Sequence, residues 1–335
     1  MSQGGISRDK MTASRFCLCL CFAVAVLLPM VTPAALDDLR EVRLFKGDAN
    51  TAYRDPAALY AEGRFHLFFT RIESPGGDVY ATVCHSESTD LAHWSSPRAL
   101  TPYDQRLNYS SPGNVVRDGA DWVLCLQTYP RPGARLTDVP PRYGDDSCRI
   151  WTMRSRDLHD WQLPELLRVK GPDVRREDMG RMIDPYLIRA DGLWYCFYKQ
   201  GGASFSTSPD LRAWTFAGRT DAGENVCVLP DNDGGWFMFH SPSNGIGVKR
   251  SEDLVHWRDL PGLITLGQRD WPWARGRLTA GAVLDARNVT GVGKYLLFFH
   301  GSGPKSETDG DFDRNASIGL AWSDDLKTWY WPHRN

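Results

Sequence analysis

Three carboxylates begin short apolar segments of this chain and are well suited to acid–base chemistry. Asp55 and Asp184 each precede a proline, and Glu224 follows Gly223. Paired carboxyl groups hydrolyse an acetal when one is protonated and assists the leaving oxygen while the other activates water or attacks carbon. Crowding like charges in a partly desolvated pocket raises one pKa and keeps that acid protonated near neutral pH. Such chemistry requires a fold that brings these distant segments together.

A repeated phrase, Ser-x-Asp-Leu-x-x-Trp, indicates what that fold is. It begins at Ser88, Ser155, Ser208, Ser251 and Ser323. Recurrence of this kind is typical of propellers, solenoids and arrays, and the unequal intervals predict loops of different length between equal units. The Ser and Asp side chains can stabilise a turn by bonding nearby backbone groups. The recurrence therefore favours a structural role for the phrase, with its Leu and Trp packed between sheets.

Three strand-like runs precede each copy of the phrase, separated by Gly, Asp and Asn as hairpin turns require. The first runs are 55–60, 111–117, 184–189, 224–229 and 279–284; the aromatic second runs are 63–70, 120–129, 192–200, 234–241 and 293–301; the third are 79–86, 148–155, 203–208, 245–251 and 316–323. With a fourth strand after each phrase, the pattern predicts an all-β, five-bladed β-propeller of four-stranded antiparallel blades around a central funnel. First strands line that funnel, so the three carboxylates are expected to converge there.

Composition and the N-terminal segment set the wider expectations. The formal charge of −2 provides no field to attract nucleic acid or an anionic membrane. Arg15 precedes an apolar stretch over 16–30, and Thr32 and Ala34 suit positions −3 and −1 of a cleavage site. We therefore predict a signal peptide over 1–34, a single catalytic propeller domain over 35–335, and a secreted or periplasmic protein with no membrane attachment after cleavage. An uncleaved anchor is the alternative.

The cysteines that would remain after cleavage are expected to be small buried apolar residues. They lie in or beside predicted strands and are Cys84, Cys125, Cys148, Cys196 and Cys227. Their odd number leaves at least one thiol unpaired. No Cys-x-x-Cys or Cys/His spacing indicates a zinc site.

At this point the sequence resembles a known group. Arg54-Asp55-Pro56, Ile183-Asp184-Pro185, the Glu of the fourth unit and the repeated phrases resemble the five-bladed glycosidases of glycoside hydrolase family 43 and its relatives, over roughly residues 45–332. The resemblance implies that Asp55 is the general base, that Asp184 tunes the acid and orients substrate, and that Glu224 is the general acid. It implies inverting hydrolysis of plant or algal glycans containing arabinose, xylose or a related sugar.

The sequence departs from that family around Glu224, which also follows Asp184 at a short interval of 40 residues. Glu224 is followed by Asn225-Val226, where the family often has Gly-Pro. Other candidates for the acid are therefore Glu177, Asp178 and His240. The related fructan and sucrose hydrolases use similar carboxylates in a retaining mechanism, but they usually begin with Asn-Asp-Pro, whereas this chain has Arg-Asp-Pro.

Further residues are expected to contact substrate. Arg54 and Asn114 are placed to bond sugar hydroxyls, and the resemblance implies a position near the axis for His300. Trp271 and Trp273 fit no repeat position, so they are candidates for a sugar-stacking platform, with burial as a loop anchor as the alternative. The insert over 130–147 is expected to rim the funnel.

We expect a monomer that acts on an oligo- or polysaccharide and requires no cofactor; the resemblance allows a structural metal ion near the axis. Two other functions stay open. One is a carbohydrate-binding propeller without hydrolysis, suggested by the context of Glu224, and the other is a retaining fructosidase-like hydrolase. A protein-interaction scaffold is less favoured, because such scaffolds rarely need acidic residues on their innermost strands. Inverting enzymes hold the two carboxyl groups about 6.5–9.5 Å apart and retaining enzymes about 5–5.5 Å apart.

Overall fold

The computed structural model describes residue 36 and residues 39–334. The predicted signal peptide, and the start of the predicted domain at residue 35, lie outside the described residues. Among the described residues, no helix has both the length and the apolar character that a membrane crossing needs.

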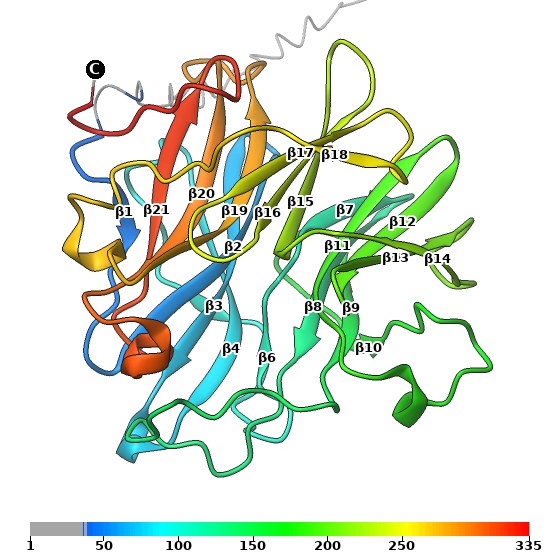
Figure 1. Cartoon of the computed structure of the whole chain (residues 1–335), viewed down its shortest axis with the longest axis horizontal. Helices are drawn as coiled ribbons and strands as arrows, with labels where there is room; N and C mark the ends of the chain where they lie inside the picture. The colour runs from blue at the N-terminus through cyan, green and yellow to red at the C-terminus, as the bar shows by residue number, and fades with distance from the viewer. Residues whose placement is uncertain (1–35, 37–38, 335) are drawn as a thin grey trace, which may run out of the picture. The chain divides into compact units, whose positions relative to one another are not determined.

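The described chain forms five antiparallel sheets arranged around a common centre (Figure 1), which confirms the predicted five-bladed propeller. The first blade contains β2 (Thr51–Ala61), β3 (Arg64–Glu73), β4 (Tyr80–Ser88) and β5 (Arg98–Ala99). The second contains β6 (Tyr109–Ser110), β7 (Val115–Asp118), β8 (Asp121–Thr128), β9 (Arg149–Ser155) and β10 (Glu165–Leu166). The third contains β11 (Ile183–Ala190), β12 (Leu193–Lys199), β13 (Ala203–Ser208) and β14 (Thr215–Thr220).

The fourth blade contains β15 (Glu224–Pro230), β16 (Trp236–Ser241), β17 (Gly247–Ser251) and β18 (Trp257–Asp259). The fifth contains β19 (Arg277–Ala286), β20 (Lys294–Ser302), β21 (Ser317–Ser323) and β1 (Arg43–Phe45). Its outer strand therefore comes from the other end of the chain and not, as expected, from the residues after the last phrase. This pairing of β1 with β21 joins the first and last parts of the propeller. Short helical turns lie in the connections: η2 (Pro75–Gly77), η3 (Arg176–Met179), η4 (Pro272–Ala274) and η5 (Glu307–Asp311).

The repeated phrase is a turn, as its recurrence predicts. In the first copy, the Ser88 hydroxyl accepts hydrogen bonds from the amides of Asp90 and Leu91, at 3.2 and 2.9 Å. The Trp94 indole donates to the Leu91 carbonyl at 2.9 Å, which closes the turn against the blade. The leucine of every copy has a positive φ, between 61° and 64°. Five copies of one local geometry correspond to the five blades.

The innermost strands share a second feature, and it shapes the centre of the molecule. One residue in each has a positive φ: Asp55 (49°), Ser111 (41°), Asp184 (52°), Asn225 (52°) and Ala280 (53°). In β2, β11, β15 and β19 this residue sits where the pairing register shifts, as in a β-bulge. A bulge redirects the side chain, and such strained positions cluster at functional sites. The five residues form an axial ring around one small cavity.

The apolar core lies between neighbouring blades. One cluster joins Phe68 of the first blade to Leu124, Leu126 and Leu158 of the second, and similar clusters follow around the ring. All five cysteines of the described part are buried, as predicted, and each of them is unpaired.

Candidate active site

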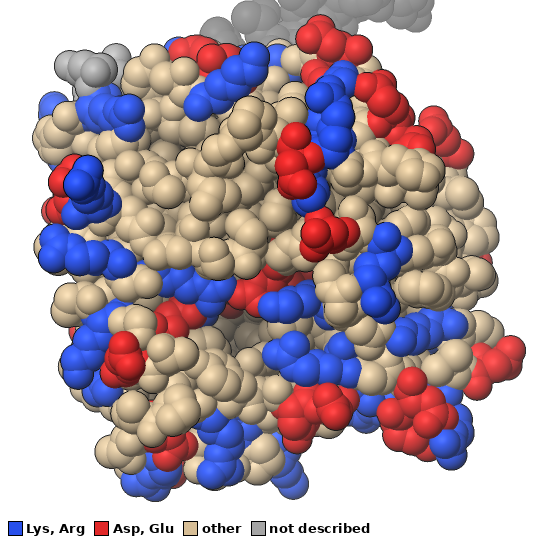
Figure 2. Space-filling view, in the orientation of Figure 1, with Lys and Arg blue, Asp and Glu red and all other residues tan. Residues whose placement is uncertain are grey.

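Asp55, Asp184 and Glu224 line one cavity at the mouth of the axial channel. They come from β2, β11 and β15, as their repeat positions suggest, and Arg54 lines the same cavity. Figure 2 shows a hollow near the centre of this face, with acidic side chains inside it and basic side chains around it. Glu224 does not occupy the axial ring. Asn225 takes that place in the fourth blade, so Glu224 corresponds to Arg54 and not to Asp55.

Hydroxyl groups orient the carboxylate of Asp55. Its Oδ2 accepts hydrogen bonds from Thr70 Oγ1 and Ser111 Oγ, both at 3.1 Å. The backbone amide of Asp55 donates to His300 Nδ1 at 3.1 Å, so this imidazole carries its proton on Nε2. His300 is completely buried, and burial followed by the charge of Arg54 lowers its pKa. It does not line the cavity, so the predicted contact of His300 with substrate is wrong; it supports Asp55 from behind.

Asp184 is the carboxyl group of the cavity that holds a proton near neutral pH. Its side chain is buried and its backbone amide donates to Gln127 Oε1 at 2.6 Å. Burial, then the negative charges of Glu224 and Asp55, raise the pKa of Asp184 to about 7. Lys199 opposes this shift but does not cancel it.

Glu224 is held as an anion by two basic side chains. Its Oε1 pairs with Arg277 and its Oε2 with Lys199 Nζ. Burial alone would raise the pKa of Glu224, but the charges of Arg277 and Lys199 outweigh burial and hold it below its usual value. In the protein without substrate, these surroundings favour the proton on Asp184 and the charge on Glu224, opposite to the distribution that a general acid at Glu224 requires.

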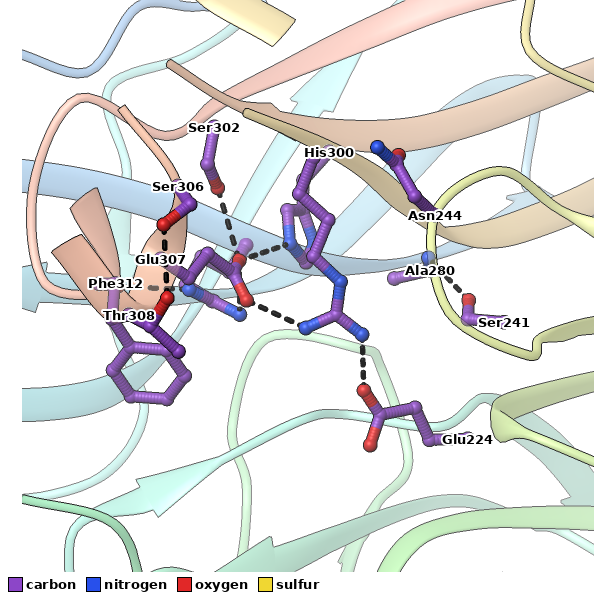
Figure 3. Close-up of polar contacts among 12 residues, drawn as sticks. Glu224, Ser241, Asn244, Ala280, His300, Ser302, Ser306, Glu307, Thr308 and Phe312 are labelled. Atoms are coloured by element: carbon purple, nitrogen blue, oxygen red, sulfur yellow. Dashed lines mark hydrogen bonds and ion pairs between the residues drawn. The ribbon is translucent and has the colours of Figure 1, made fainter. Parts of the chain in front are cut away.

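A network of charges continues from Glu224 into the fifth blade (Figure 3). Arg277 also pairs with Glu307 Oε2 at 2.5 Å, and Glu307 Oε1 pairs with Arg54 at 2.9 Å. Arg54 donates to the carbonyl of Phe312 at 2.8 Å and lies over its ring. Because Arg54, Arg277 and Glu307 satisfy one another, they fix the wall of the cavity beside Glu224.

Sequence reasoning missed Lys199, Arg277 and Glu307. Arg277 and Lys199 lie at ends of strands, where a basic residue has no pattern to distinguish it. Glu307 lies in η5, in a connection without any repeat signal. The only signal for Arg277 in the sequence was its position in the fifth unit. It lies two residues before Thr279, which precedes the axial-ring residue Ala280.

Three further residues that were expected to contact substrate lie outside the cavity lining. Asn114 bridges the second and third blades, donating to the Leu187 carbonyl at 2.7 Å and accepting from the Leu187 amide at 2.9 Å. It does not line the cavity because these backbone groups already use its amide. Trp271 and Trp273 stack on each other and on Phe299, with centroids 5.4, 6.1 and 6.0 Å apart, so they anchor a loop and form no platform.

The other candidates for the acid lie outside the cavity. Glu177 and Asp178 pair with Arg175 on η3. His240 is buried and accepts a hydrogen bond from the Gly223 amide at 2.9 Å. The insert over 130–147 contributes Arg131 to the cavity lining, where Asp313 pairs with it.

No cluster of metal ligands forms on the axis within residues 39–334. The group of His, Cys, Asp or Glu side chains that could hold an ion in this range lies in the first blade, at His66, His85 and Glu87. The axial ion that the family resemblance allows stays a prediction.

The fold is that of the five-bladed propeller glycoside hydrolases, which confirms the resemblance found in the sequence. An exo-1,5-α-L-arabinanase from a bovine ruminal metagenomic library superposes with a TM-score of 0.57 at 15% identity, covering 86% of this chain and 100% of that chain. A thermostable family-43 glycoside hydrolase gives 0.58 at 13%, covering 90% and 97%. A Bombyx mori family-32 β-fructofuranosidase gives 0.56 at 14%, covering 85% and 63%.

Two curated proteins are similar to this chain in sequence. The sucrose-6-phosphate hydrolase of Klebsiella pneumoniae is 27% identical over 207 residues, which are 58% of this chain and 41% of the relative. That of Salmonella typhimurium is 26% identical over 212 residues, 59% of this chain and 42% of the relative. The matched segment thus spans less than half the length of these relatives. No protein-family model matches the chain.

Proposed function

We propose that this protein is a glycoside hydrolase whose active site is the axial cavity. The observation that carries the proposal is the contrast between two neighbouring carboxyl groups. The pKa of Asp184 is raised to about 7 by burial and like charges, whereas Lys199 and Arg277 hold that of Glu224 down. Titratable groups whose environments push their pKa values apart are the arrangement that acid–base hydrolysis uses. The propeller glycosidase fold supports the same conclusion.

Asp184 is assigned as the proton donor and Asp55 as the group that activates water. Asp184 and Glu224 interact and titrate as a pair, and near neutral pH the proton of the pair resides on Asp184. The hydroxyls of Thr70 and Ser111 fix the orientation of Asp55, as a base requires. Glu224 then keeps Arg277 at the cavity, where it can bind sugar hydroxyls. This assignment departs from the role that the family resemblance gives Glu224.

The substrate class is a glycan or oligosaccharide with arabinose-type, xylose-type or related sugars. Solved structures with this fold include an arabinanase, a β-xylosidase and a β-fructofuranosidase, each known by those names. With Asp55 as a base, cleavage is a single displacement with inversion. The sequence likeness to sucrose-6-phosphate hydrolases favours a retaining fructosidase as the second candidate. Nuclear magnetic resonance of the first anomer released decides between inversion and retention.

The primary test is a screen of purified protein against aryl glycosides, arabinans, xylans and sucrose. D55N is expected to lower kcat/KM by about 10²–10⁴ on any active substrate. D285N is the matched control, because Asp285 also lies on an innermost strand but pairs with exposed Arg287 outside the cavity. Equal activity of D55N and wild type would reject the proposed site.

A carbohydrate-binding propeller without hydrolysis is favoured by one specific observation, the pairing of Glu224 with both Arg277 and Lys199. That function predicts a wild-type protein that binds glycans, measured by calorimetry, and releases no reducing sugar. Any hydrolysis that D55N abolishes excludes it.

Export of a monomer is also part of the proposal. It is supported by Arg15, the apolar stretch over 16–30 and the small residues Thr32 and Ala34. Expression in the native host should give a mature protein that begins after Ala34, as N-terminal sequencing would detect. Light scattering should give the mass of one chain.

A further inference from the structure

A second cluster of titratable side chains lies in the first blade, at the end of β3 remote from the cavity. His66 lies on β3, and His85 and Glu87 lie on β4. In the pairing register His66 faces Glu87, and Phe68 faces His85. Paired residues of antiparallel strands share a face and side chains two positions apart point the same way. All three side chains therefore project from the same side of the blade, toward the second blade.

The two imidazoles are already spaced as metal ligands. His66 Nδ1 lies 3.0 Å from His85 Nε2, and the rings are nearly parallel, 9° apart, with centroids 5.2 Å apart. One ligand atom from each of His66, His85 and Glu87 lies within 4.8 Å of the others. Tetrahedral Zn²⁺ with bonds of about 2.0–2.1 Å places its ligand atoms roughly 3.3 Å apart. The histidine pair is close to this spacing, and a ligand atom of Glu87 lies within 4.8 Å of both.

A fourth side chain with a ligand atom lies on the neighbouring blade, next to Glu87. His159, in the repeated phrase of the second blade, has its Nε2 4.0 Å from Glu87 Oε2. Its ring centroid lies 6.4 Å from that of His66 and 6.0 Å from that of His85. Arg98, which pairs with His85 across β4 and β5, donates to the His159 carbonyl at 2.7 Å and holds the loop in place. Three imidazoles and one carboxylate thus converge from two blades.

The electrostatics of the cluster suit a cation. Glu87 Oε2 is buried without a hydrogen-bond partner among the described residues, and such a charge is costly unless it is paired. Its other oxygen lies 3.6 Å from Arg64 on the solvent side.

We propose that His66, His85, Glu87 and His159 bind one divalent transition-metal ion, with Zn²⁺ as the best match to three nitrogen ligands and one oxygen. Such a donor set is typical of zinc sites. The ion would join the first blade to the second, because three ligands belong to one blade and His159 to the other. Its role is structural, since Thr70, which contacts Asp55, lies at the opposite end of β3.

Calorimetric titration of the full chain, without an affinity tag and stripped with a chelator, tests this site with ZnCl₂ alone. Wild type is expected to bind one Zn²⁺ per chain. H159A and E87Q should each weaken binding at least about tenfold. H256A is the matched control, because His256 is an exposed histidine of the same phrase in the fourth blade, with 86% of its side chain exposed, and should bind as wild type does.

Two further readouts separate a true site from surface binding. Co²⁺ should give the intense visible absorption of tetrahedral coordination in wild type and H256A, and lose it in H159A. Zn²⁺ at a hundredfold excess over its Kd should raise the Tm by about 5 °C. Because His159 is half exposed, its loss leaves the core packed and the variant folded. Absence of Zn²⁺ binding by wild type, or equal binding by wild type, H159A and E87Q, overturns the proposal.

Discussion

Arg277 and Glu224 form an ion pair inside the axial cavity, where family resemblance places a protonated acid. The pair extends to Glu307, which holds Arg277 from the other side. A carboxylate in this position gives up its charge only if both Arg277 and Lys199 move away. Burial and the negative charges of Glu224 and Asp55 favour the proton on Asp184.

The raised pKa of Asp184 makes stability depend on pH. Its pKa in the folded protein, about 7, exceeds the unfolded value of about 3.9, so the folded state binds this proton more tightly. The contribution of Asp184 to stability is fully present below about pH 4 and is lost as pH rises through 7. D184N keeps the shape without the charge and should increase the free energy of unfolding by about 4 kcal/mol at pH 8, and hardly at pH 4.

Urea unfolding of wild type and D184N at the two pH values measures this difference. D118N is the control, since Asp118 pairs with Arg154 away from the cavity. A D184N variant no more stable than wild type at pH 8 contradicts the assigned protonation.

Loss of Arg277 should destabilise the protein, because Glu224 and Glu307 would each lose one ion-pair partner in a largely buried network. R277Q is expected to lower the free energy of unfolding by about 3 kcal/mol. R287Q removes an exposed ion pair with Asp285 on the same strand and should cost less than about 1 kcal/mol. Chemical denaturation distinguishes them, and equal losses would mean that the buried network adds no stability.

Much of the architecture could be predicted from the sequence. The Ser-x-Asp-Leu-x-x-Trp turns are local structures with local signals, so blade number and strand order follow from them. Asp55 and Asp184 were identifiable because each occupies the same bulge of an innermost strand and precedes proline. In the fourth blade, the residue equivalent to Asp55 and Asp184 is Asn225, and Glu224 lies one position before it. The sequence does not reveal this difference of one residue, because only the pairing of the strands defines the register.

The rest depends on contacts between segments far apart in the chain. The sequence around Glu307 does not show that Glu307 pairs with Arg54, more than 250 residues earlier. Likewise, the sequence around Asn114 does not show that the side-chain amide of Asn114 bonds both backbone groups of Leu187. Trp271 and Trp273 have the same local sequence whether they face a sugar or the core.

Asn114 should matter for stability and not for substrate. N114A leaves the amide and carbonyl of Leu187 without partners between two blades, so unfolding should become easier by about 1–3 kcal/mol. KM should stay within about twofold of wild type, because Asn114 does not line the cavity. A large rise in KM with unchanged stability would show that Asn114 contacts the substrate, against this account.

His300 should affect catalysis through Asp55. H300A removes the acceptor for the Asp55 amide, so Asp55 loses its fixed orientation. We expect kcat to fall by about 10²-fold with KM little changed, because misplacement of a catalytic group by about 1 Å has an effect of this size. H300N, which offers another acceptor, should recover part of the loss. Circular dichroism checks that H300A is folded. An unchanged kcat in H300A would show that His300 does not affect the reaction.

The most direct measurement of the central claim compares leaving groups. A dinitrophenyl glycoside departs without a proton, whereas a methyl glycoside needs one, so loss of the acid slows only the second. D184N is predicted to lose about 10²–10⁴ in kcat/KM on the methyl glycoside and to stay near wild type on the dinitrophenyl glycoside. If E224Q shows that selective loss and D184N does not, the proton donor is Glu224 and this account of the cavity is wrong.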